Sequence, residues 1–224
     1  MKYQWILFDA DETLFHFDAF QGLKLMFSRL NVDFTQQDFD EYQELNKPLW
    51  LQYQEGSITA ECLQITRFSE WANKLEISAQ YLNSQFLTAM ADICAPLLGV
   101  KELLQALKGK VKLGIITNGF TDLQRVRLER TGLQDAFDLL VISEQVGVAK
   151  PNVKIFEHAF SLMGNPAREH VLMVGDTLKS DIKGGINMGI DTCWYNAHSL
   201  ENNEAFSATF EVTSHDQLQR LLRV

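Results

Sequence analysis

The residues best suited to chemistry in this chain are carboxylates that follow short apolar runs. Asp9 and Asp11 come directly after the run 3–8, and Asp176 follows the run 171–174. Carboxylates brought close together repel one another unless a cation lies between them, and oxygen ligands of this kind suit Mg²⁺. Within the first pair, one carboxylate could attack phosphorus while the other transfers the leaving-group proton.

Hydroxyl, ammonium and backbone donors stand at similar positions. Thr117, Asn118 and Gly119 follow the apolar run 112–116, and Lys150 stands at the start of a predicted helix. Such donors can hold the oxygens of a phosphoryl group, whose transfer depends mainly on positioning and charge neutralisation. Taken singly, Thr117 could merely cap a helix and Lys150 could be a solvent-exposed lysine.

The elements that must position these residues alternate between strands and helices. Short continuous apolar runs predict strands buried on both faces, as in a parallel sheet. The predicted strands are 3–8, 112–116, 139–142, 171–174 and 192–195, and the predicted helices between the later ones are 121–130, 151–163 and 179–188. This alternation predicts a doubly wound α/β fold, in which sites lie at the carboxyl ends of the strands. We therefore expect the polar residues above to meet in one crevice.

The segment 17–95 differs because it shows helical patterns and no strand pattern. Helices are predicted over 20–30, 36–54, 59–74 and 78–93, with Thr35 and Ser78 as N-caps. We expect an α/β catalytic core formed by 1–16 and 96–224, and an inserted all-helical cap formed by 17–95.

Four motifs of the haloacid dehalogenase-like hydrolase superfamily occur here in order. They are Asp9-x-Asp11-x-Thr13, Thr117-Asn118, Lys150-Pro151 and Gly175-Asp176-x-x-x-x-Asp181. The chain resembles this superfamily over essentially its whole length. The resemblance implies a phosphatase that requires Mg²⁺, for which Mn²⁺ can substitute, and that forms an aspartyl-phosphate intermediate.

The resemblance also implies residue roles. Asp9 would be the nucleophile, and Asp11 would protonate the leaving oxygen and then activate water. The metal would be held by Asp9, Asp176 and the backbone carbonyl of Asp11. Many relatives have glycine where Glu12 stands, and a carboxylate there could crowd the incoming phosphate.

Further implied roles concern the phosphoryl group. Thr117 and Lys150 would hold it, with backbone N–H groups near Asp11 and Asn118 as additional donors, and Asn118 and Gly119 would contact the substrate. Asp181 would orient a metal-bound water or Lys150. The alternative for Asp181 is an ion pair on a helix face with Lys179 or Lys183.

Within the superfamily, the chain most resembles bacterial pyrimidine 5′-nucleotidases that act on nucleoside monophosphates, through the tracts 9–15, 46–50 and 147–152. The candidate contacts of such a substrate with this chain are Phe15, Phe17, Trp50, Asn46 and Lys47. Packing in a hydrophobic core is the alternative for the aromatic residues, and a helix end before Pro48 is the alternative for Asn46 and Lys47.

Three other functions are compatible with parts of this pattern. A phosphosugar phosphatase or mutase would share the whole machinery. A dehalogenase of the same superfamily would need Asp9 but generally lacks an acid two residues further on. A non-catalytic nucleotide-binding module would usually have lost Asp9 or Asp11, and both are present.

Composition limits the partners and the setting. The formal charge is −9 and no dense run of lysine or arginine occurs, so we expect a small phosphomonoester and no nucleic acid polymer as partner. No stretch reaches the 18 or more apolar residues of a membrane span. Three scattered cysteines, Cys62, Cys94 and Cys193, suggest neither a disulfide framework nor a metal site. We expect a cytoplasmic protein that is a monomer or a weak homo-oligomer.

Overall fold

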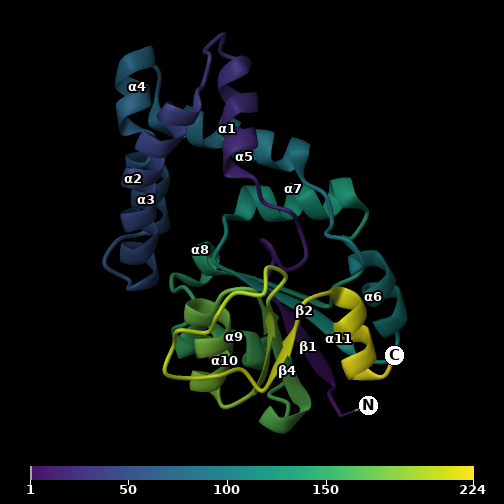
Figure 1. The fold of residues 1–224 in the computed structure, drawn as a ribbon. Coiled ribbons are helices and arrows are strands. Elements are labelled where there is room, and N and C mark those ends of the chain that lie inside the picture. The colour runs from purple at the N-terminus through teal and green to yellow at the C-terminus, as the bar shows by residue number, and fades with distance from the viewer. Residues whose placement is uncertain (1) are drawn as a thin grey trace.

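The computed structural model describes residues 2–224, and one six-stranded parallel sheet forms its centre (Figure 1). The strands are β1 (Trp5–Phe8), β2 (Lys112–Thr117), β3 (Leu139–Ile142), β4 (Val171–Gly175), β5 (Asp191–Tyr195) and β6 (Phe210–Val212). Their order across the sheet is β3-β2-β1-β4-β5-β6. The predicted doubly wound α/β fold is confirmed. The sixth strand was not predicted, because three residues are too few to show a period.

Helices cover both faces of the sheet, which explains why the strands are continuously apolar. Ile6 and Phe8 of β1 point toward one core, together with residues of α6 (Val100–Leu107) and α11 (His215–Leu222). Trp5 and Leu7 point toward a second core, with residues of α9 (Val153–Leu162) and α10 (Lys183–Met188). The remaining helices of the sheet region are α7 (Thr121–Thr131) and α8 (Ser143–Val146), with a 3-10 turn, η1 (Arg168–His170).

The predicted helix 179–188 is divided in two. Residues Leu178–Ile182 form a single π-helical turn, η2, and α10 begins only at Lys183. A π turn widens the backbone locally and is frequent at functional sites. Here the π turn contains Asp181 and follows the carboxyl end of β4.

Six helices stand between β1 and β2, and the first five of them lie beyond one end of the sheet (Figure 1). These five are α1 (Ala19–Ser28), α2 (Gln36–Gln54), α3 (Ala60–Thr66), α4 (Ser69–Leu75) and α5 (Ala79–Ile93). Thr35 and Ser78 cap α2 and α5 as predicted, each accepting a backbone N–H. The predicted helix 59–74 is interrupted near Phe68, whose fully buried side chain packs against Phe86 at a centroid distance of 5.8 Å.

These five helices have their own hydrophobic core, which includes Phe27 and Phe34 stacked at 4.7 Å. Phe120 and Ala149 from the sheet region also belong to it. The two chain crossings between the helices and the sheet lie side by side, since the N–H of His16 donates to the carbonyl of Ala95 at 2.9 Å. The two hydrogen-bonded connecting segments therefore link the five helices to the sheet at the carboxyl ends of its strands.

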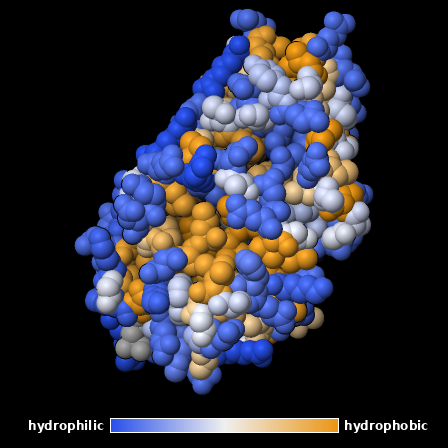
Figure 2. All heavy atoms as spheres, turned by 180° about the vertical axis from the view of Figure 1, so that it is seen from behind, coloured by the Kyte–Doolittle hydropathy of each residue, from blue (hydrophilic) through white to orange (hydrophobic). Residues whose placement is uncertain are grey.

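One face of the molecule can be described by its hydropathy. Hydrophilic residues cover much of the face seen in Figure 2, and hydrophobic residues gather near its middle. Among residues 2–224, no helix combines the length and the apolar character needed to cross a bilayer.

Candidate active site

The carboxyl ends of three adjacent strands bring the predicted chemical groups together. Asp9 follows β1, Thr117 ends β2 and Asp176 follows β4. Phe8 is in register with Ile115 and Val174, so the residues that follow these strands emerge at the same level. The resulting cavity has a volume of about 190 Å³. It is lined by Asp9, Asp11, Glu12, Trp50, Gln54, Thr117, Asn118, Gly119, Lys150, Asp176, Thr177 and Ser180.

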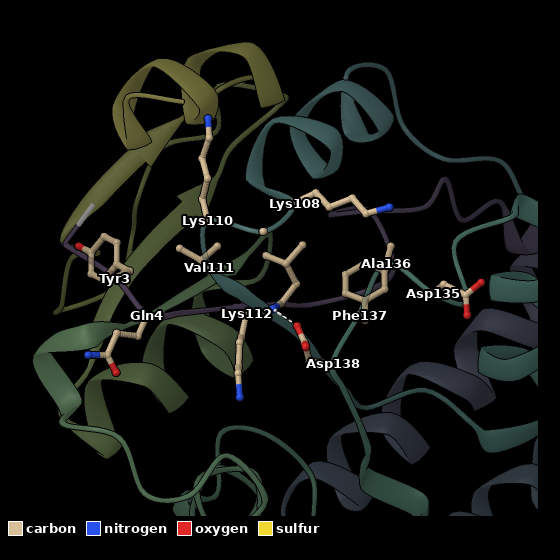
Figure 3. A pocket seen from close by; sticks show the side chains of 12 residues that line it. Tyr3, Gln4, Lys108, Lys110, Val111, Lys112, Asp135, Ala136, Phe137 and Asp138 are labelled. Carbon is tan, nitrogen blue, oxygen red and sulfur yellow. Dashed lines mark hydrogen bonds between the residues drawn. The ribbon is translucent and has the colours of Figure 1, made fainter.

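A larger hollow of about 590 Å³ lies at the opposite, amino end of β2. Figure 3 shows Lys108, Lys110 and Lys112 around it, with Asp138 accepting a hydrogen bond from the backbone N–H of Leu113 at 2.9 Å. Its lysines point outward and it contains no grouped carboxylates. Within the described residues, the carboxylates that could hold a metal lie at the smaller cavity, and the chemistry belongs there.

Lys150 is the centre of the charged network. Its Nζ donates to Asp9 Oδ1 at 2.5 Å, to the carbonyl of Ile116 at 2.6 Å, and pairs with Asp181 Oδ1 at 2.7 Å. These three oxygens surround the ammonium group, and only 1% of the side chain is exposed. Burial alone would lower the pKa of Lys150, but Asp181 and Asp9 outweigh it and raise the pKa above the ordinary value. Lys150 is therefore a permanent buried cation.

Three carboxylates crowd around that cation. One oxygen each from Asp9, Asp176 and Asp181 lies within 4.8 Å of the others. Burial, with the charges of Asp181 and Asp11 added, raises the pKa of Asp9 to about 7 despite the opposing effect of Lys150. Burial and the charges of Asp181 and Asp9 raise the pKa of Asp176 to about 8. Without a bound metal ion, Asp9 and Asp176 thus keep their protons at pH values where isolated carboxyl groups would release them.

A divalent cation fits this donor set. Four carboxylates, Asp9, Asp11, Asp176 and Asp181, face the two cations Lys150 and Arg127, so these six side chains together carry a formal charge of −2. Carboxylate oxygens are the ligands that Mg²⁺ prefers, and it keeps several waters when bound. A single Mg²⁺ would neutralise the site. The cluster in the structure contains the Asp181 side chain, whereas the predicted ligand set contained the carbonyl of Asp11 instead.

Asp181 is held firmly beside Lys150. Its Oδ2 accepts the N–H of Thr177 at 3.0 Å, and 1% of the residue is exposed. A Cβ on Gly175 would lie 2.3 Å from Asp181 Oδ2, so glycine is required there by close approach. The alternative of a surface ion pair with Lys179 or Lys183 is wrong, because Asp181 is buried and Lys179 reaches Glu204 at 3.5 Å.

The loop after β2 supports Lys150 from the other side. Asn118 donates through Nδ2 to the carbonyl of Lys150 at 3.0 Å and accepts the Lys150 N–H at 2.7 Å. Both ends of this amide are thus occupied, so Asn118 fixes the backbone of Lys150. Thr117 is 1% exposed and its Oγ1 accepts the N–H of Gly119 at 3.0 Å, which fixes the turn beneath the cavity.

Asp11 has a partner that the sequence motifs did not reveal. Its Oδ1 accepts a hydrogen bond from Nη1 of Arg127 at 2.5 Å. Arg127 stands on α7 and is 1% exposed. The sequence carried a weak signal for it. Leu123, Val126 and Leu128 are the only apolar residues of α7, so the packed face of this helix has to include polar side chains, but the sequence does not say which ones.

The Glu12 carboxylate, which could have crowded the incoming phosphate, is bound to the segment that follows it. The backbone of Glu12 is left-handed, with φ of 54°, a conformation in which glycine carries no steric cost. The carboxylate turns toward the connection to the helices, where it accepts the N–H of Phe17 at 2.5 Å and lies 3.3 Å from His16 Nδ1. It still borders the cavity, so its negative charge adds to the field there.

Trp50 is the one predicted aromatic that lines the cavity, and Gln54, one turn further along α2, lines it too. Trp50 packs against Phe120 at 5.3 Å and Tyr53 at 5.9 Å. Gln54 was not predicted, because a single glutamine near a helix end carries no pattern.

The other predicted substrate contacts lie elsewhere. Phe15 has no exposed surface and belongs to the core of the sheet, and Phe17 packs against the core of the five helices. Asn46 is buried on α2, where its Oδ1 accepts a hydrogen bond from the Tyr42 hydroxyl at 3.4 Å. Lys47 is exposed and is absent from the cavity lining. None of these four residues lines the cavity: the two aromatic rings pack in hydrophobic cores, and Asn46 lies on the same face of α2 as Trp50 but one turn earlier in the helix.

Known proteins match the whole chain. The haloacid dehalogenase-like hydrolase family matches residues 3–189. Pyrimidine 5′-nucleotidase YjjG of Escherichia coli (strain K12) is 58% identical over 222 residues, which is 99% of each chain. Pyrimidine 5′-nucleotidase PynA of Streptococcus pneumoniae (strain ATCC BAA-255 / R6) is 35% identical and covers 97% of this chain and 94% of its own.

Among solved structures, the putative HAD-hydrolase YfnB of Bacillus subtilis bound to magnesium superposes with a TM-score of 0.86. It is 30% identical, and the match covers 100% of both chains. That structure is described as revealing interdomain movement.

Proposed function

We propose that this chain, which belongs to the haloacid dehalogenase-like hydrolase family, is a 5′-nucleotidase that hydrolyses pyrimidine nucleoside monophosphates with Mg²⁺. The observation that carries the substrate class is the 58% identity to a pyrimidine 5′-nucleotidase over 99% of both chains. The reaction class is supported independently by the buried Lys150 held between Asp9 and Asp181.

In the first step, a carboxylate oxygen of Asp9 attacks phosphorus, and the bond between phosphorus and the 5′-oxygen breaks. Asp11 gives its proton to that oxygen, so the nucleoside leaves as a neutral alcohol. Lys150 stays charged beside Asp9 and opposes the negative charge on the transferred group. In this proposal the hydroxyl of Thr117 and the backbone N–H groups near Asp11 and Asn118 hold the phosphoryl oxygens.

In the second step, Asp11 removes a proton from water, and the water oxygen attacks phosphorus. The bond to Asp9 breaks, which releases inorganic phosphate and restores the Asp9 carboxylate. A bound Mg²⁺ supplies charge neutralisation and orients the phosphoryl group. Asp9, Asp176 and Asp181 are the side chains grouped to hold it, and Mn²⁺ has compatible ligand preferences.

The five helices α1 to α5 act as a cap in this proposal. Trp50 presents an aromatic ring at the cavity, on which a pyrimidine base can stack. A phosphosugar phosphatase would use the same carboxylates but gain nothing from this ring. We further propose that the enzyme works in the cytoplasm as a monomer or weak homo-oligomer.

A phosphate-release panel tests the proposal. Pyrimidine and purine nucleoside monophosphates, sugar phosphates and an aryl phosphate are compared with Mg²⁺, with Mn²⁺ and with excess chelator. We expect the highest kcat/KM for pyrimidine monophosphates and no turnover in chelator. Sugar phosphates exceeding every nucleotide would favour the phosphosugar alternative, and halide release from a haloacid would favour a dehalogenase. If no phosphate ester is turned over, a non-catalytic nucleotide-binding module is the alternative that remains.

A further inference from the structure

Arg127 is a buried cation that contacts Asp11 and has no ion pair with Asp9, Asp176 or Asp181 among the described residues. It comes from α7, and its Nη1 donates to Asp11 Oδ1. Asp11 is partly accessible, with 29% of its side chain exposed, whereas the Arg127 side chain is 1% exposed. The pair therefore joins a buried cation to a carboxylate that faces the cavity.

Two neighbours fix the direction of the guanidinium. Gln124, one turn earlier on α7, accepts a hydrogen bond from Nη2 through its Oε1. The guanidinium carbon lies 4.6 Å from the centroid of the Phe15 ring, which is fully buried. A planar cation held over an aromatic face and by a side chain on one edge has little freedom to turn. Phe15 thus forms the floor under Arg127.

This arrangement is poor for stability. Nε of Arg127 and Nε2 of Gln124 are both buried and have no hydrogen-bond partner among the protein atoms of residues 2–224. A buried unsatisfied donor costs about 1–3 kcal/mol, and more when the group is charged. Violations of hydrogen-bond satisfaction of this kind are expected where function, and not stability, fixes a residue. A leucine or methionine at either position would fill the same space without an orphaned donor.

We propose that Arg127 is a positioning residue that holds the Asp11 carboxylate toward the leaving oxygen of the substrate. Arg127 engages Oδ1, which leaves Oδ2 to carry the transferred proton. Gln124 and Phe15 act by holding Arg127. The proposal rests on the proposed phosphatase function, because it assigns Arg127 to the step in which Asp11 moves a proton.

The test compares two substrates that differ in their need for that proton. Uridine monophosphate has a poor leaving group, whereas p-nitrophenyl phosphate needs little protonation of its leaving oxygen. For Arg127→Met we expect kcat on uridine monophosphate to fall about 100-fold, the scale of a misplaced catalytic group. KM on uridine monophosphate and kcat on p-nitrophenyl phosphate should stay within about threefold. Arg125→Met is the matched control, since Arg125 is exposed on the same helix.

A double mutant separates positioning from packing. Arg127→Met should add almost nothing to the loss already caused by Asp11→Asn, because both changes remove the same proton transfer. Arg127→Lys should recover part of the activity, since it keeps the charge but has no planar fork. Multiplied losses in the double mutant would overturn the proposal.

If Arg127→Met does not fold, Gln124→Met provides the same test, because it removes the Oε1 acceptor while keeping the side-chain shape. We expect its loss to be smaller, about tenfold, and again confined to uridine monophosphate. Equal losses on both substrates, or no loss, in a folded variant would overturn the role of Arg127 while the proposed function stands. A wild-type enzyme that hydrolyses neither substrate would overturn both.

Discussion

The ammonium nitrogen of Lys150 lies 2.7 Å from Oδ1 of Asp181, and each side chain is 1% exposed. The same nitrogen lies 2.5 Å from Oδ1 of Asp9. One buried cation therefore compensates two carboxylates, of which one is the proposed nucleophile. A buried ion pair is costly to form, and removing one partner leaves a charge without compensation.

Lys150→Met should abolish phosphate release and also destabilise the fold. Losing one partner of a buried pair typically costs about 3–5 kcal/mol, because the remaining carboxylates stay buried. Urea unfolding at neutral pH in chelator measures this loss, with Lys154→Met, exposed on α9, as the matched control. A Lys150→Met protein as stable as the control would show that the network does not stabilise the fold.

Asp9→Asn should eliminate turnover and leave stability intact or higher in metal-free buffer. The amide is a poor nucleophile, and it removes one of the crowded carboxylates whose pKa is raised by burial and by its neighbours. Phosphate release and thermal unfolding, measured side by side, check both halves. Activity within tenfold of wild type would exclude Asp9 as the nucleophile.

The stability gained from Mg²⁺ should grow with pH. Burial and like charges raise the pKa of Asp9 to about 7 and of Asp176 to about 8, from 3.8. A raised folded pKa gives stabilisation that is complete below the unfolded pKa and is lost as pH rises through about 7 to 8. The metal-free protein should therefore weaken on going from acid to alkaline conditions.

Mg²⁺ binds the deprotonated carboxylates, so it should restore the folding stability that is lost as the pH rises. We expect the increase in Tm on adding Mg²⁺ to be larger at about pH 8 than at about pH 5.5. The Asp176→Asn variant should show a smaller increase with little dependence on pH. An equal increase at both pH values in the wild type would contradict the proposed metal site.

Much of the site could be predicted because it follows strands whose apolar runs are unambiguous. Asp9, Thr117 and Asp176 each come directly after such a run, and parallel strands end at one edge. The sequence-based prediction for the cap aromatics was less successful. Phe15 and Trp50 are both large and apolar, and only the packed structure shows that one is buried under Arg127 while the other borders the cavity.

Arg127 could not be predicted with the motifs, because its function depends on a long-range contact. It is separated from Asp11 in the chain by all five inserted helices, and no spacing rule links the two. The π turn at Leu178–Ile182 was missed for a related reason. Local propensity favours a continuous helix there, but the bond between Asp181 and the Thr177 N–H imposes a wider turn.

Trp50→Ala should change substrate preference and leave the chemical step intact. Stacking of a base on an aromatic side chain is worth about 1–3 kcal/mol, so kcat/KM for pyrimidine monophosphates should fall roughly 5- to 100-fold through KM. Turnover of p-nitrophenyl phosphate should change little, because Trp50 takes no part in the ion pair between Lys150 and Asp9.

Trp71→Ala is the matched control. The Trp71 ring packs 4.4 Å from the Phe27 ring, centroid to centroid, in the core of the five helices, and Trp71 does not line the cavity. Its loss should therefore lower Tm without altering the ratio of the two activities. If Trp50→Ala leaves the nucleotide KM unchanged, or lowers both activities equally, the base does not stack on this ring, and Gln54 becomes the next side chain of α2 to test.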